Sequence, residues 1–197
     1  MKTMGKFSFN ENIKGLIFDC DGTLVDSMPL HMKAWEKSFN QFNERYDENF
    51  LFSLKGMKET EIIELYNKEF RTSIEPENIV RAKHEYFIRH INEVKPIKPV
   101  VDVVKSYFGK FPLAVVSGSV KEIVYSELKV VGIYDLFNVI LTADDPFKPK
   151  PDPEIFINAA SKIKISPERC LVFEDGDPGL EAAIRAGMQT IDVRKYL

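Results

Sequence analysis

The sequence predicts an α/β protein in which a helical segment interrupts a core built on a parallel sheet. Three observations lead to this prediction. Short apolar runs alternate with amphipathic helical patterns from residue 100 onward, and one further apolar run lies at residues 13–18. Residues 30–94, which lie between them, carry long amphipathic patterns without a convincing strand. Apolar strands that alternate with helices indicate a parallel sheet covered on both faces. We therefore expect a core of residues 1–26 and 95–197 and an inserted helical domain of residues 27–94.

The first half of the chain predicts one strand and three helices. Residues 1–12 look like a polar lead-in, and residues 13–18 predict the first strand. Pro29 fits the first turn of a helix, so the next helix is expected to begin near it. Asp26 or Ser27, which precede this turn, could therefore cap it. Apolar side chains then recur at three- and four-residue spacing, as on one face of a helix. They include Trp35, Phe39 and Phe42 in one helix, Ile62, Ile63, Tyr66 and Phe70 in a second, and Ile79, Val80, Phe87 and Ile91 in a third that begins at Pro76.

Pro96 and Pro99 mark the return to the core, where strands and helices alternate. Gly109, Gly132 and Gly187 each follow a helical pattern, as glycine commonly does at a helix C-terminus. Together with residues 13–18, the later strands predict a Rossmann-like parallel sheet. Strands are expected at residues 113–116, 138–141, 170–173 and 190–193, and helices at residues 100–108, 120–130, 154–164 and 180–186.

The composition excludes several classes of function. The chain has 197 residues, of which 44% are hydrophobic, and this suffices for a core with a modest insertion. A net charge of −3 argues against a nucleic-acid partner. No apolar stretch has the length of a membrane span or a secretory leader, so we expect no membrane partner and a cytoplasmic location. Cys20 and Cys170 lie in apolar surroundings and are expected to be free thiols. Nothing in the sequence requires more than a monomer.

Polar clusters follow three of the predicted strands at the point where each strand ends. They are Asp19 with Asp21, Ser117 with Ser119, and Glu174 with Asp175. Because the carboxyl ends of parallel strands share one edge of a sheet, these side chains should converge there. Two carboxylates as close as Asp19 and Asp21 repel each other unless a cation lies between them or one keeps its proton. Oxygen ligands favour a hard ion, and Mg2+ is the first choice.

Each polar segment also has a simpler interpretation when it is taken alone. Asp21-Gly22 is a common turn signal, and Ser119 could be a plain helix cap. The segment 148–153 contains two lysines and could be a solvated loop. Asp177, which precedes a proline, is expected to cap a helix.

Four segments, taken in order, resemble the motifs of the haloacid dehalogenase superfamily. The first is Asp19-Cys20-Asp21-Gly22-Thr23. This resemblance implies that Asp19 is the nucleophile that becomes an aspartyl-phosphate and that Asp21 is the acid/base. It also implies that the Asp19 side chain and the Asp21 carbonyl bind Mg2+ and that Thr23 contributes to substrate binding. Family members that cleave carbon–halogen bonds typically lack the second aspartate, so Asp21 favours phosphoryl chemistry.

The second and fourth motifs add a phosphate site and further metal ligands. Ser117-Gly118-Ser119 resembles the second motif, which implies that Ser117 binds the transferring phosphoryl group with help from Gly118 and Ser119. Residues 172–177 resemble the fourth motif. This implies that Asp175 is a direct Mg2+ ligand and that Glu174 is a second ligand or acts through water.

The third motif contains the functional lysine. Residues 148–153 resemble it in the register that makes Lys148 the functional lysine and Lys150 the variable position. Lys148 would then neutralise Asp19 and the phosphoryl oxygens. The chemistry of the two side chains does not choose between them, and assays of the two alanine variants would decide.

The inserted helices resemble the cap of the beta-phosphoglucomutase subgroup, at residues 30–35 and 54–57. The resemblance implies that His31 is a substrate-site residue, although a partly exposed surface histidine is an equal alternative. Lys83 is a candidate to reach toward the substrate, and a solvated helical lysine is the alternative. Where the mutase has an arginine that grips a second phosphate, this chain has Glu59, an acid that would repel it.

These inferences predict a Mg-dependent phosphatase that acts on a small phosphorylated metabolite, a sugar phosphate, through an aspartyl-phosphate. Beta-phosphoglucomutase is the alternative. A receiver-like switch, phosphorylated for signalling, is more remote because a receiver needs the open face that an inserted cap would cover. The sequence does not identify the sugar phosphate.

Overall fold

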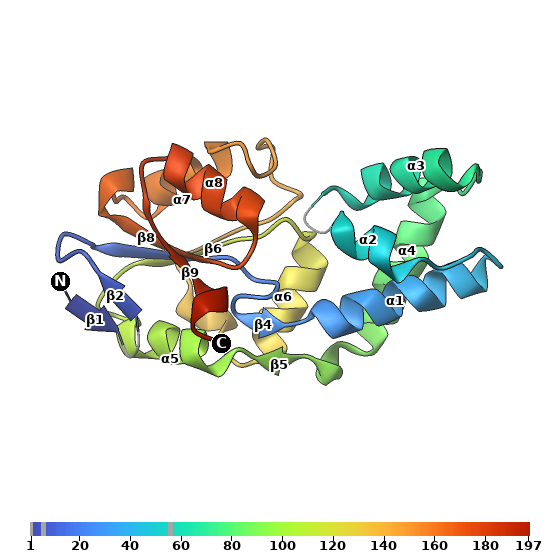
Figure 1. Cartoon of the computed structure of the whole chain (residues 1–197). Coiled ribbons are helices and arrows are strands. Elements are labelled where there is room, and N and C mark those ends of the chain that lie inside the picture. The colour runs from blue at the N-terminus through green and yellow to red at the C-terminus, as the bar shows by residue number, and fades with distance from the viewer. Residues whose placement is uncertain (1, 5–6, 55–56) are drawn as a thin grey trace. The chain divides into compact units, whose positions relative to one another are not determined.

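The computed structural model describes residues 2–4, 7–54 and 57–197. The chain forms two compact units, one of Met1–Asp26 with Lys95–Leu197 and the other of Ser27–Val94 (Figure 1). Lys55 and Gly56, which contribute to the resemblance of residues 54–57, lie outside the described residues. Among the helices that the structure describes, none has the length and apolar character needed to cross a bilayer.

A five-stranded parallel sheet forms the centre of the first unit, which confirms the predicted fold class. The middle strand β3 pairs with β6 on one side and with β8 on the other. Every residue of these three strands is buried, which is why they read as unbroken apolar runs in the sequence. In spatial order the strands are β7 (Val139–Leu141), β6 (Leu113–Val116), β3 (Gly15–Phe18), β8 (Cys170–Glu174) and β9 (Gln189–Asp192).

Helices cover both faces of this sheet. Figure 1 shows α7 and α8 on one face and α5 and α6 on the other. On the first face, Ile17 and Val172 of the sheet share a buried core with Phe156 and Ala183 of the helices. The helices are α5 (Lys98–Tyr107), α6 (Lys121–Val130), α7 (Glu154–Lys162) and α8 (Asp177–Arg185), and short 3-10 turns lie at Tyr134–Leu136, Pro167–Arg169 and Val193–Lys195.

The prediction of a polar lead-in at the N-terminus is wrong. Strands β1 (Lys2–Met4) and β2 (Phe7–Phe9) form an antiparallel pair. Phe7 and Phe9 are buried, and the Phe7 ring lies 5.2 Å from that of Phe173 and 4.8 Å from that of Tyr196. A three-residue alternation is too short to predict a strand, and the aromatic rings that Phe7 contacts lie at the far end of the sequence. A second short pair joins β4 (Val25–Asp26) to β5 (Lys95–Pro96).

The second unit is helical, and its described residues contain no strand. Three of its helices follow the predicted apolar patterns, and the six-residue α2 is an addition. Ser27 occupies the N-cap position of α1 but makes no side-chain capping hydrogen bond. Aromatic rings fill the interior, with Phe39 and Phe50 lying 4.8 Å and 5.6 Å from Tyr66. The helices are α1 (Met28–Gln41), α2 (Glu48–Ser53), α3 (Glu59–Phe70) and α4 (Pro76–Arg89), followed by a 3-10 turn at Ile91–Glu93.

A buried lysine links three elements of this helical unit. The side chain of Lys83 is only 1% exposed, so the alternative of a solvated lysine is wrong. Its Nζ lies 2.8 Å from Nδ1 of His31 and forms an ion pair with Glu59, which also pairs with His84. His31 is itself buried and stacks on Phe87 at 4.2 Å, so it is not a surface histidine. The charge of Glu59 is therefore partly offset within the unit, and its repulsion of a second phosphate stays a prediction.

The Glu59 ion pairs predict a pH-dependent contribution to stability. Burial alone would raise the pKa of Glu59, but Lys83 and His84 lower it from 4.5 to about 2. Ionised Glu59 therefore stabilises the fold above about pH 4.5, and this contribution is lost as the pH falls toward 2. We expect Glu59→Gln to lower the melting temperature at neutral pH, with a difference from wild type that shrinks over that acid interval. Calorimetry across this range tests it, with the exposed neighbour Glu61→Gln as the control. A difference that stays constant would contradict the ion-pair explanation.

Candidate active site

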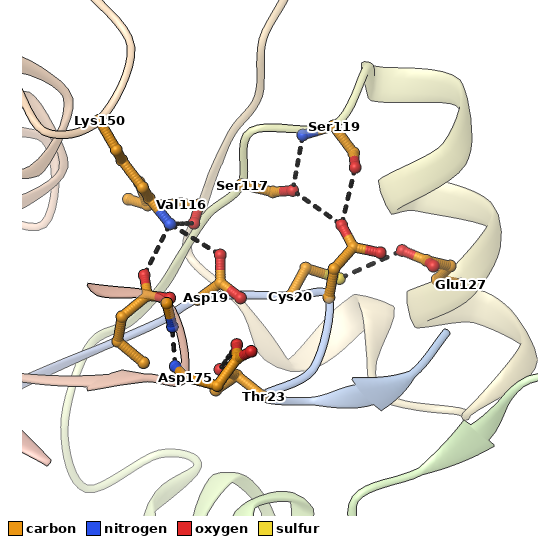
Figure 2. Close-up of polar contacts among 12 residues, drawn as sticks. Asp19, Cys20, Thr23, Val116, Ser117, Ser119, Glu127, Lys150 and Asp175 are labelled. Atoms are coloured by element: carbon orange, nitrogen blue, oxygen red, sulfur yellow. Dashed lines mark hydrogen bonds and ion pairs between the residues drawn. The ribbon is translucent and has the colours of Figure 1, made fainter. Parts of the chain in front are cut away.

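The edge of the sheet at the strand carboxyl ends carries the polar residues of the candidate site. The hydrogen bonds of the sheet continue one residue beyond β3 and β6. The amide of Asp19 donates to the carbonyl of Phe173 at 2.9 Å, and that of Ser117 donates to the carbonyl of Leu141 at 3.0 Å. Both residues are therefore fixed in the sheet while their side chains lie at its edge. Figure 2 shows Asp19, Ser117 and Asp175 in one polar cluster, as the topology predicted.

Three acids gather closely at this edge. Asp19, Glu174 and Asp175 each offer a carboxylate oxygen within 4.8 Å of the others. Burial raises the pKa of Asp19 well above its usual range, and the neighbouring charges of Glu174 and Asp175 raise it further. Such a cluster is unfavourable without a cation, and hard divalent ions prefer carboxylate oxygens. The donor set of this edge therefore fits a divalent metal ion.

The structure corrects the choice of lysine. Nζ of Lys150 donates to Asp19 at 2.7 Å, to Glu174 at 2.8 Å and to the carbonyl of Val116 at 3.2 Å (Figure 2). Its side chain is 12% exposed, whereas that of Lys148 is 73% exposed and lies 3.9 Å from Asp152. Burial alone would lower the pKa of Lys150, but Asp19 and Glu174 raise it, so the ammonium stays charged. Lys150, and not Lys148, is the cation of the cluster.

Serine hydroxyls hold the second aspartate. Oγ of Ser119 donates to Oδ2 of Asp21 at 2.7 Å, and Oγ of Ser117 lies 3.4 Å from the same oxygen. Ser119 is thus more than a helix cap, and the N-cap position of α6 belongs to Val120. Gly118 lies exposed between the two serines. The loop before α6 therefore fixes the Asp21 carboxylate.

Thr23 and Asp177 make contacts that the sequence did not predict. Thr23 is fully buried, and its hydroxyl donates to Oδ1 of Asp175 at 3.0 Å, so this side chain contacts a carboxylate of the cluster. Asp177 is the first residue of α8, whose N-cap position is taken by Gly176. The exposed carboxylate of Asp177 accepts from Arg194 at 2.7 Å. His31 and Lys83 belong to the helical unit and contact each other there.

Gly179 is a position at the candidate site that the sequence analysis missed. It lies in α8 beside the buried carboxylate of Glu174. A Cβ atom at this position would lie 1.9 Å from Oε2 and 2.8 Å from Cγ of Glu174. The predicted helix begins at residue 180, so the sequence placed Gly179 just outside it, whereas the observed α8 includes this glycine, where alanine would be the better helix former. The missing side chain makes room for the carboxylate that binds Lys150.

Adding this methyl group should damage the site without damaging the helix. We expect Gly179→Ala to displace Glu174 and to lower turnover by about 100-fold, because small displacements of catalytic groups are costly. Helix propensity favours alanine by about 1 kcal/mol and offsets part of the strain from the clash, and melting temperatures of the variant separate a loss of turnover from global unfolding. The control is Gly187→Ala, where φ is +78° and no atom lies within 4 Å of the added Cβ. That variant should lower the melting temperature and leave turnover unchanged. Equal turnover losses in the two variants would contradict the steric explanation.

Comparison with known proteins assigns this chain to a family. The model of the haloacid dehalogenase-like hydrolases matches residues 16–193. The chain belongs to this family. As a hydrolase of this family, it is 36% identical over 186 residues to the fructose-1-phosphate phosphatase YqaB of Escherichia coli, with 93% of this chain and 98% of the relative covered.

The hydrolase also resembles proteins named as phosphoglucomutases. It is 29% identical to the beta-phosphoglucomutase of Bacillus subtilis, over 92% of this chain and 83% of the relative. The crystal structure of beta-phosphoglucomutase from Clostridium difficile superimposes with a TM-score of 0.74 at 30% identity, over 90% of this chain and 83% of the other. These likenesses place the hydrolase in the beta-phosphoglucomutase-like subgroup of its family, where phosphatases and mutases share one fold.

Proposed function

We propose that this enzyme hydrolyses a sugar monophosphate through a phosphorylated Asp19. The observation that carries the proposal is the contact between Lys150 and Asp19 within a cluster of three carboxylates. A carboxylate held by an ammonium at a strand end is a positioned nucleophile, and the same cation offsets charge on phosphoryl oxygens. The named activity of the Escherichia coli relative supports a sugar phosphate as the substrate.

The proposed reaction has two steps. An oxygen of Asp19 bonds to phosphorus while the ester bond to the alcohol breaks, and Asp21 gives its proton to the departing oxygen. Water then attacks the same phosphorus, Asp21 takes a proton from it, and the bond between Asp19 and phosphorus breaks. The hydroxyls of Ser117 and Ser119 donate hydrogen bonds to the Asp21 carboxylate and so fix its orientation for both proton transfers.

The acidic cluster would hold Mg2+ through Asp19, Asp175 and Glu174, with the main-chain carbonyl of Asp21. When bound, Mg2+ would offset negative charge that develops on the phosphoryl oxygens. Thr23 orients Asp175 for this role. The helical unit of residues 27–94 would act as a cap that selects the substrate, with His31 and Lys83 as its candidate polar residues.

A phosphate-release screen over sugar phosphates with Mg2+ tests this function. We expect fructose 1-phosphate to be among the substrates that release phosphate. The mutase is the second candidate, favoured by the likeness to beta-phosphoglucomutases. Glucose 1-phosphate with a bisphosphate primer would then yield glucose 6-phosphate in place of free phosphate. A long-lived aspartyl-phosphate without phosphate release would instead support the receiver-like switch.

A further inference from the structure

A buried thiol lies between the two candidate catalytic aspartates. Cys20 is fully buried, and its Sγ donates a hydrogen bond to Oε2 of Glu127 at 3.4 Å (Figure 2). Glu127 comes from α6, 107 positions further along the chain, and is also fully buried. The motif that contains Asp19 and Asp21 is thus hydrogen-bonded to a distant carboxyl group through Cys20, which lies between the two aspartates.

The main chain of Cys20 organises the turn that follows. Its carbonyl accepts hydrogen bonds from the amides of Thr23 at 3.2 Å, Leu24 at 2.9 Å and Val25 at 3.0 Å. One peptide group therefore folds the segment 20–25 back on itself. Any rotation of the Cys20 peptide would move the adjoining Asp21 together with this turn.

The α6 segment thus contacts the aspartate motif at two points. In the loop before α6, Ser119 donates a hydrogen bond to the Asp21 carboxylate, and within the helix Glu127 accepts one from Cys20. A buried carboxyl group is a poor means of stabilising a fold, because apolar packing avoids the cost of removing it from water. The contact therefore suits a role in geometry better than a role in stability.

We propose that Glu127 is a positioning residue that acts through the Cys20 thiol to fix the orientation of Asp19 and Asp21. The proposal rests on the proposed phosphatase reaction for its kinetic consequences. Its structural consequence, an ordered turn at residues 20–25, does not depend on that reaction.

Kinetics of matched variants form the first part of the test. We expect Cys20→Ala and Glu127→Leu each to lower kcat about tenfold with little change in KM, using p-nitrophenyl phosphate with Mg2+. Cys20→Ser and Glu127→Gln keep a donor and an acceptor and should stay within about threefold of wild type. The double variant, Cys20→Ala with Glu127→Leu, should be no slower than either single variant, because both remove the same contact.

The control is the other buried cysteine. Sγ of Cys170 donates to the carbonyl of Ser166 at 3.6 Å, away from the aspartates. Cys170→Ala should leave kcat unchanged even where it lowers the melting temperature. If kcat falls equally in Cys170→Ala and Cys20→Ala, or if Cys20→Ser is as slow as Cys20→Ala, the positioning role is refuted.

Hydrogen exchange gives a readout that needs no activity. Amides of Thr23, Leu24 and Val25 should exchange about tenfold faster in Cys20→Ala and Glu127→Leu, and at the wild-type rate in Cys20→Ser. Unchanged exchange in both of the first two variants would overturn the proposal. An inactive wild type would count against the phosphatase assignment alone, and exchange would still decide on the contact.

Discussion

Replacing Asp19 with asparagine is expected to abolish phosphate release and to raise the melting temperature of the metal-free protein. An amide cannot form the acyl-phosphate, so turnover should fall by about 10,000-fold or more. The opposite change in stability follows from the pKa of Asp19, which burial and the charges of Glu174 and Asp175 raise well above its usual range. A carboxylate whose pKa is raised by folding makes the native state less stable as the pH rises from the ordinary pKa of the carboxyl to the raised value in the fold, and this loss persists at higher pH. Asparagine removes this cost at neutral pH.

Three measurements test this pair of effects. Phosphate release gives turnover, calorimetry with a chelator present gives the melting temperature, and acid quenching of wild type with labelled substrate should trap phosphate on Asp19. The control is Asp102→Asn, which changes an exposed aspartate of the same unit and should alter neither quantity. Substantial turnover in Asp19→Asn would refute the nucleophile assignment.

Lys150→Met is expected to lower kcat by about 1,000-fold, whereas Lys148→Met should stay within about twofold of wild type. Lys150 contacts Asp19 and Glu174 at 2.7 Å and 2.8 Å, and methionine leaves both buried carboxylates without this cation. Lys150 lowers the pKa of Asp19, so its removal raises that pKa further. The ionised nucleophile would then appear at higher pH, and the acid side of the kcat profile should move to higher pH.

The two lysines make a matched pair, because the same change is made two positions apart in one loop. The Lys148 ammonium lies 3.9 Å from Asp152 at the surface, where an ion pair contributes little. Steady-state kinetics across pH, with melting temperatures of both variants, separate a catalytic loss from unfolding. A loss confined to Lys148→Met would reverse the assignment of the functional lysine.

Local sequence patterns predicted the parallel sheet and the edge, at the carboxyl ends of its strands, where the candidate site lies. Strands β3, β6 and β8 are buried on both faces, so most of their residues are apolar, and the polar residues Asp19, Ser117 and Glu174 lie at or just beyond the strand ends. Where patterns were short, the prediction failed. Phe7 and Phe9 belong to a three-residue strand, and the ring of Phe7 packs against Tyr196, a residue that no local signal links to it.

The sequence by itself determined that acids and hydroxyls lie at the carboxyl ends of several parallel strands and therefore share one edge of the sheet. Local patterns suffice for this, because apolar runs that alternate with helices indicate buried parallel strands. Only the tertiary structure decided which side chains meet there: Lys150 in place of Lys148, Thr23 turned toward Asp175, and Glu127 against Cys20. The physical reason is that a hydrogen bond or ion pair depends on the direction of a side chain to within about an ångström. That direction is set by packing between segments more than a hundred residues apart, which spacing along the chain does not encode.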